Sequence, residues 1–147
     1  LAVGLLATID PFEQLKKGRD TSLRNTTAEF YNANLRYYST KGKFPWATDK
    51  LYDSALVGGQ TDVLPDLITV GELKTKFYTL AGSANLNKIF LTSTGPENLA
   101  VCFKPESKSF QEDPVTLFAA NGSSYASGTC KSEVVGTGGI DCNYCVQ

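Results

Sequence analysis

The stretch Asp10–Gly42, DPFEQLKKGRDTSLRNTTAEFYNANLRYYSTKG, decides the fold because it predicts one long helix. Asp10 can accept hydrogen bonds from the free backbone N–H groups of a first turn, and Pro11 fits the first helical position. Glu13 stands where the second partner of a capping box belongs. Together these residues predict a helix that begins at Pro11.

The end of the helix has signals of its own. Lys41 is a basic residue for the last turn, Gly42 is a typical C′ glycine, and Pro45 follows three residues later. Between the two ends, Gly18 is the one residue that weakens a helix. At ~1.5 Å per residue the helix is about 45 Å long, longer than a domain of this size is wide on most axes.

The two halves of the predicted helix carry different side chains. Between Phe12 and Asp20, only Phe12 and Leu15 are large and apolar. In the second half, the large apolar residues fall within an arc of about 160°, which predicts a face that packs on a core. These residues are Leu23, Phe30, Tyr31, Leu35, Tyr37 and Tyr38. The residues on the opposite side are Asn25, Glu29, Asn32 and Arg36. We therefore expect residues 1–20 to project as an assembly segment and residues 21–147 to form a globular head.

An uncharged, almost wholly apolar run, LAVGLLATI, occupies Leu1–Ile9. It is far shorter than the ~20 residues that a membrane-spanning helix needs. Gly4 weakens a helix, and Pro11 removes a backbone hydrogen bond, so Gly4, Asp10 and Pro11 mark where a continuous helix would kink or melt. We expect the apolar side chains of this end to be buried between molecules of an assembly. The residues expected there are Leu1, Val3, Leu5, Leu6, Ile9 and Phe12.

Short strands are predicted after the helix. Alternating apolar residues predict strands at Lys76–Ala81, Lys88–Thr92 and Leu99–Lys104, and a fourth is possible at Val115–Ala119. Short turn-rich links between the first three favour an antiparallel meander. Further short elements are expected near Lys50–Val57 and Leu64–Val70. The predicted fold class is α+β, with a long N-terminal helix packed on an antiparallel meander of three or four strands.

All four cysteines lie in the last third of the chain, at Cys102, Cys130, Cys142 and Cys145. An even number of cysteines in a loop-rich region is typical of disulfides formed in an oxidising compartment. The sequence does not choose among the three possible pairings; we favour Cys130 with Cys142 and Cys102 with Cys145. The alternative is a zinc site of four thiolates, which usually shows two close pairs of cysteines, whereas only Cys142 and Cys145 are close here.

The composition offers little for catalysis. Histidine, the commonest general acid–base residue, is absent from the 147 residues, and we expect neither an enzyme nor a cofactor. The net charge of −1 argues against binding to nucleic-acid phosphates. The basic residues around Lys16 alternate with acidic ones, which predicts local or intersubunit ion pairs. Asp113 and Asp141 are weak candidates for a calcium site, since calcium takes oxygen ligands from irregular loops.

Three motifs in the first 45 residues resemble bacterial type IV pilins. They are LLATIDPFEQLKKGRD at Leu5–Asp20, NLRYY at Asn34–Tyr38 and KGKFP at Lys41–Pro45. The resemblance implies a long N-terminal helix packed on an antiparallel sheet, with the apolar helix end buried in the core of a filament. It also implies a prepilin-peptidase site just upstream of Leu1, and it places Gly4 and Pro11 where polymerising pilins carry helix-weakening residues.

This resemblance leads us to expect a structural subunit of a type IV pilus or pilus-like extracellular filament. The expected partners are identical subunits in a helical filament and, before assembly, the pilus assembly machinery of the inner membrane. Neither a specific nucleic acid nor a small-molecule substrate is expected. Two alternatives stay open: a pseudopilin of a type II secretion system, and a secreted adhesin or binding module anchored by its N-terminus.

Overall fold

A computed structural model describes residues 10–47, 49–126, 129–130 and 141–147. Its longest element is α2 (Pro11–Lys41), a helix of 31 residues with the predicted start and end. Asp10 Oδ1 accepts hydrogen bonds from the backbone N–H of Phe12 at 2.9 Å and of Glu13 at 3.4 Å. At the other end Gly42 has a φ of 70°, a left-handed conformation that favours glycine, and its N–H donates to Tyr38 O.

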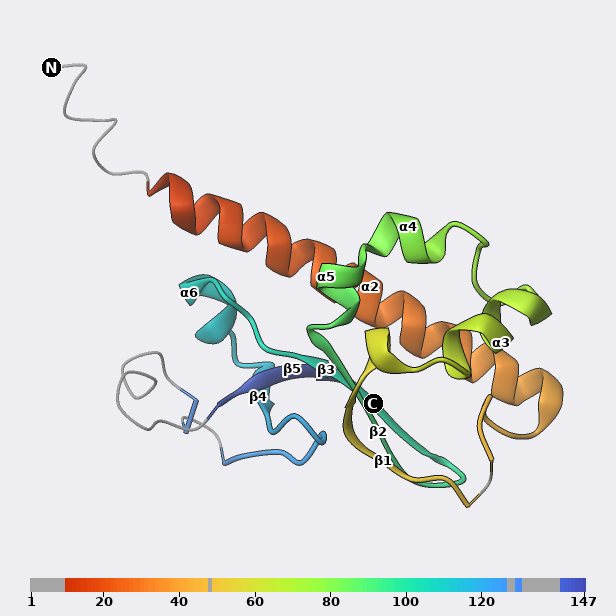
Figure 1. Ribbon diagram of the computed structural model, residues 1–147. Helices are drawn as coiled ribbons and strands as arrows, with labels where there is room; N and C mark the ends of the chain where they lie inside the picture. Colours follow the sequence, from red (N-terminus) through yellow and green to blue (C-terminus); the bar gives the residue numbers. More distant parts are fainter. Residues whose placement is uncertain (1–9, 48, 127–128, 131–140) are drawn as a thin grey trace, which may run out of the picture.

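Five strands form one antiparallel sheet beside this helix (Figure 1). In sheet order they are β1 (Tyr52–Leu56), β2 (Ile89–Gly95), β3 (Asn98–Phe103), β5 (Asn143–Val146) and β4 (Thr116–Phe118). The predicted α+β layout is confirmed. The sheet has five strands where three or four were expected, and it departs from a simple meander because β5 lies between β3 and β4.

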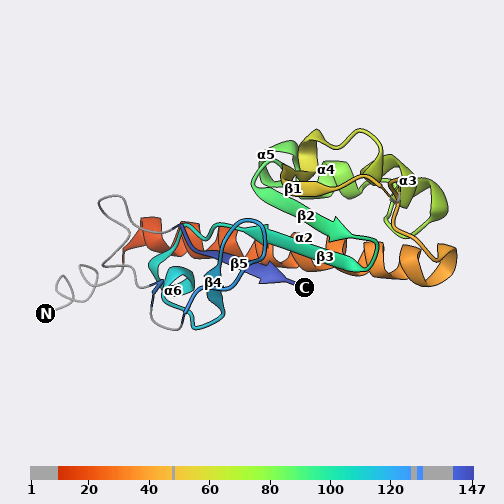
Figure 2. The ribbon, with the colours of Figure 1, turned by 90° about the horizontal axis from the view of Figure 1, so that it is seen from below.

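The helical elements outside α2 are short. They are η1 (Val57–Gly59), α3 (Val63–Val70), α4 (Phe77–Ala81), α5 (Ser83–Leu86) and α6 (Lys108–Gln111). The view in Figure 2 shows α3, α4 and α5 grouped near the C-terminal half of α2, and α6 near its N-terminal half. The short elements expected near residues 50–57 and 64–70 correspond to β1 and α3.

The strand predicted at Lys76–Ala81 is wrong, because these residues form α4. Phe77 and Ala81 are buried while Tyr78 and Leu80 are exposed. Two buried residues four positions apart lie on one face of a helix, so the burial here follows the helical period and not the period of two that a strand requires.

The core lies between the second half of α2, one face of the sheet and the short helices α3, α4 and α5. On α2, Leu23 and Phe30 are fully buried. Leu91 and Val101 are paired across β2 and β3 and face the same core. The expectation that Leu35 joins this core is wrong, since its side chain is 39% exposed. At 100° per residue Leu35 lies about 140° around the helix from Phe30, outside the face that the sheet covers.

Candidate functional site

The first turns of α2, Pro11–Arg19, extend past the sheet toward the N-terminus (Figure 1); we call this segment the neck. Phe12 is 71% exposed and Leu15 is 63% exposed. Phe12 precedes the fully buried Phe30 by eighteen residues, which is about five helical turns, so the two side chains lie on the same line of the helix. The line of α2 that faces the core therefore continues past the sheet as an exposed apolar surface.

The other predicted assembly residues lie outside the described residues. They are Leu1, Val3, Leu5, Leu6 and Ile9, and the predicted helix-weakening residue Gly4 lies there too. Asp10 and Pro11 take the positions predicted for them, as the N-cap and first residue of α2. Among the described residues, no helix has the length and apolar character needed to cross a membrane.

One side of the neck is anchored to the head through acidic side chains. Asp20, which follows the neck directly, is fully buried, and its carboxylate accepts hydrogen bonds from Glu106 N at 2.9 Å and Ser107 N at 2.8 Å. The hydroxyl of Ser107 also donates to it, at 2.6 Å. Two turns earlier, Glu13 Oε2 accepts from Lys108 N at 3.1 Å. The two carboxylates thus bind the backbone at the start of α6 to the long helix.

Our sequence analysis missed the role of Asp20. A signal was present, because Asp20 precedes the buried Leu23 by three residues and the buried Thr27 by seven. That spacing places its carboxylate on the core-facing side of α2, where an acidic side chain needs hydrogen-bond donors. The capping-box role predicted for Glu13 is not observed, since its two carboxylate oxygens are used by Lys16 and Lys108.

The predicted local ion pairs are present around the neck. Lys16 Nζ lies 2.9 Å from Glu13 Oε1, and this hydrogen bond holds the pKa of Glu13 below its ordinary value. Glu106 is shared by Lys88 at 2.6 Å and Arg19 at 3.5 Å. The hydrogen bond from Lys88 is the largest cause of a lowered pKa at Glu106, and burial opposes it. Lys16, Arg19 and Lys88 are thus paired with acids of the same chain.

Two disulfides link the C-terminal segment to the fold, in the pairing favoured from the sequence. Cys102 and Cys145 are directly opposite each other on β3 and β5, with Cα atoms 4.1 Å apart. Cys130 and Cys142 close a loop with a sequence separation of 12. All four sulfur atoms are consumed in this way, which excludes the alternative of a four-thiolate zinc site.

The two calcium candidates have other partners. Asp113 Oδ1 accepts a hydrogen bond from Val115 N at 3.1 Å, and Asp141 pairs with Lys104 at 2.5 Å. In the part of the chain that the structure describes, no three Cys, Asp or Glu side chains come together in a way that could hold a metal ion.

Comparison with other proteins adds no relative: no family model, no curated protein and no solved structure matches this chain. The described residues combine a long helix packed on an antiparallel sheet, a disulfide-linked C-terminal segment and an exposed apolar surface on the neck.

Proposed function

We propose that this chain is a structural subunit of a type IV pilus or a similar extracellular filament. The observation that carries the proposal is the exposed apolar surface of the neck at Phe12 and Leu15, on the same helix whose second half is packed in the core. The apolar run Leu1–Ile9 comes directly before it in the sequence. The pilin-like motifs of the first 45 residues support the same function.

Assembly would proceed by burying this end of the helix between neighbouring copies. Apolar surface removed from water contributes about 25 cal/mol per Å2, which favours association when many such side chains are covered together. A head-to-tail contact between identical copies that does not close into a ring produces an open helical filament. Before assembly, the proposed partner is the pilus assembly machinery of the inner membrane.

The hydrogen bonds that anchor the neck support a further role: a contact made by the neck would also fix the placement of the head. Glu13 and Asp20 accept hydrogen bonds from the backbone of residues 106–108, so this part of α2 is joined directly to the start of α6. A neighbouring copy that binds the apolar side of the neck therefore sets the position of the head as well.

The test is electron microscopy of material assembled by the full chain and by two variants. Deleting Leu1–Ile9, or combining Phe12→Ser with Leu15→Ser, is expected to leave a folded head that no longer forms fibres. A matched control combines Leu51→Ser with Leu80→Ser, two leucines that are 63% and 76% exposed but lie outside α2. Unimpaired fibres from the deletion, or discrete particles from the full chain, would refute the proposal.

A further inference from the structure

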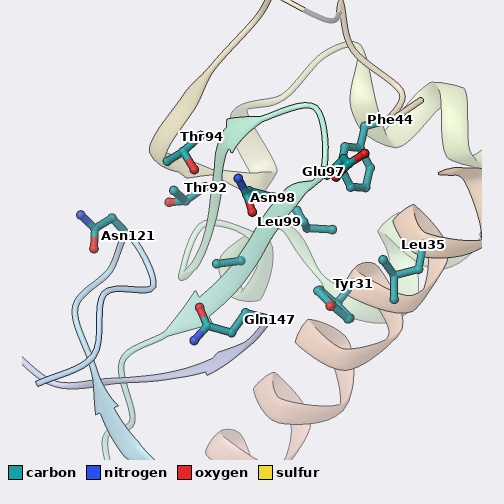
Figure 3. A pocket seen from close by; sticks show the side chains of 11 residues that line it. Tyr31, Leu35, Phe44, Thr92, Thr94, Glu97, Asn98, Leu99, Asn121 and Gln147 are labelled. Atoms are coloured by element: carbon teal, nitrogen blue, oxygen red, sulfur yellow. The ribbon is translucent and has the colours of Figure 1, made fainter. Parts of the chain in front are cut away.

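Phe44, which follows α2 in the chain, lines two cavities. Figure 3 shows the larger one, of about 450 Å3, where Glu97 is the one charged side chain among the described residues that line it. The second cavity has a volume of about 280 Å3, and charged side chains of both signs line it. We call it the Trp46 cavity. It lies at the end of α2 opposite to the neck and shares no residue with it.

Buried aromatic side chains form the floor of the Trp46 cavity. Tyr37, Phe44 and Trp46 line it and are all buried. The ring of Trp46 stacks on that of Phe44, with the centroids 4.8 Å apart, and Tyr52 packs at right angles to Trp46 at 5.3 Å. Contacts of this kind hold aromatic rings in a fixed arrangement. The floor is therefore an apolar surface that exists before any ligand binds, as in most small-molecule sites.

Two opposite charges at this cavity have no partner within the described residues. Asp66, in the first turn of α3, and Lys43, just after α2, are both exposed and both line the cavity. Neither side chain forms a hydrogen bond or an ion pair with any described residue, so the two are not paired with each other. Asp62, by contrast, accepts from Lys50 Nζ at 2.6 Å and from Val63 N at 3.0 Å. The carboxylate of Asp66 and the ammonium of Lys43 are therefore available to a ligand.

These charges define the charges of the ligand. Because Lys43 and Asp66 are opposite in sign, and Asp62 is already paired with Lys50, a ligand with a single charge is attracted by one of the free groups and repelled by the other. A zwitterion is attracted by both. The flexible four-carbon stem of Lys43 allows its ammonium to reach a carboxylate held near Asp66. The aromatic floor favours a ligand that also carries an apolar group, since its burial is favourable.

We propose that the Trp46 cavity binds a free α-amino acid with an apolar side chain. The ammonium of the ligand lies at Asp66, its carboxylate at Lys43, and its side chain on the floor formed by Phe44 and Trp46. The volume of about 280 Å3 is at the lower end of the ~300–1,000 Å3 typical of ligand pockets, which suits a molecule as small as a single amino acid. Binding here does not require filament assembly.

The test uses the fluorescence of Trp46, the one tryptophan among the 147 residues. L-Phenylalanine is titrated into the whole chain with excitation at a wavelength that phenylalanine does not absorb, and the indole N–H resonance of Trp46 is followed by NMR in the same samples. Both signals are expected to saturate with one Kd. The control ligand is N-acetyl-L-phenylalaninamide, which keeps the ring and lacks both charges. It is expected to bind about four- to twenty-fivefold more weakly, because two exposed ion pairs are lost.

Two variants assign the charges, with ligands that carry one charge each. Asp66→Asn is expected to weaken binding of L-phenylalanine and of phenethylamine, which keeps only the ammonium, about two- to fivefold, the range for an exposed ion pair. It is not expected to weaken binding of 3-phenylpropionate, which keeps only the carboxylate. Lys43→Gln is expected to weaken L-phenylalanine and 3-phenylpropionate in the same range, and not phenethylamine. The matched controls Glu97→Gln and Lys74→Gln remove exposed charges outside this cavity and are expected to leave all three affinities unchanged.

Three results would overturn the proposal. The first is that neither signal of Trp46 changes up to the solubility limit of L-phenylalanine. The second is that N-acetyl-L-phenylalaninamide binds as tightly as L-phenylalanine, which would mean that the charges of the ligand are not recognised. The third is that Asp66→Asn and Lys43→Gln both leave the affinity for L-phenylalanine unchanged.

Discussion

Phe12 and Phe30 lie on one line of the same helix, yet one is 71% exposed and the other is fully buried. The two residues have the same secondary structure and the same direction around the helix axis, because both lie inside α2, five turns apart. What differs is the covering: the sheet extends over the second half of the helix and ends before the neck (Figure 1). The comparison teaches that α2 extends beyond the sheet, so that its first turns leave Phe12 and Leu15 exposed; we propose that another copy of the chain covers them.

The largest expected effect separates these two phenylalanines. Phe30→Ala removes a fully buried ring and is expected to lower the free energy of unfolding by about 3–5 kcal/mol. Phe12→Ala removes an exposed ring and is expected to change it by less than about 0.5 kcal/mol. Urea denaturation of both variants measures the difference. Equal losses would mean that the neck is packed within its own molecule, contrary to our account.

The next effect separates the two carboxylates that anchor the neck. Asp20→Ala leaves Glu106 N, Ser107 N and the Ser107 hydroxyl without their acceptor in a buried place, and is expected to cost about 3 kcal/mol. Glu13→Ala removes the carboxylate that accepts from Lys108 N at the exposed end of the neck, and we expect a much smaller shift of the urea midpoint. A loss from Asp20→Ala no larger than that from Glu13→Ala would contradict the anchoring role.

The smallest predicted effect is a dependence on pH. The lowered pKa of Glu106 means that folding favours its charged form, so its contribution is complete above its ordinary value of 4.5 and disappears as the pH falls below that value. Because this side chain is partly exposed, we expect only about 0.5 kcal/mol. Between pH 6 and pH 3, Glu106→Gln should therefore lose about 0.5 kcal/mol less free energy of unfolding than the unmodified chain. An unchanged acid profile in this variant would show that the Lys88 and Arg19 contacts do not contribute.

Features determined by neighbouring residues were predictable from the sequence. Asp10, Pro11 and Gly42 define the ends of α2, and all three act locally. Residues 76–81 were misread because a five-residue helix with two buried residues offers too short a pattern for its period to be recognised. The position of β5 between β3 and β4 depends on pairing across long sequence separations, which no local pattern contains.

The hydrogen bonds of Asp20 could not be predicted for the same reason, because their donors are far away in the sequence. The hydrogen bonds of Asp20 join residues separated by 86 and 87 positions. The sequence places Asp20 on the core-facing side of the helix, but the donors that satisfy its carboxylate are backbone groups of a distant loop. The disulfide pairing is the one that we favoured among the three possible, although the choice depends on strand pairing that no local pattern contains.

The most direct test of the account is hydroxyl-radical footprinting of the neck in material before and after assembly, read by mass spectrometry. If a neighbouring copy covers the apolar side of the neck, labelling of Phe12 and Leu15 falls sharply in the assembled material, while Phe30 stays unlabelled in both states. Equal labelling of Phe12 and Leu15 in the dissociated and assembled states would contradict the central claim.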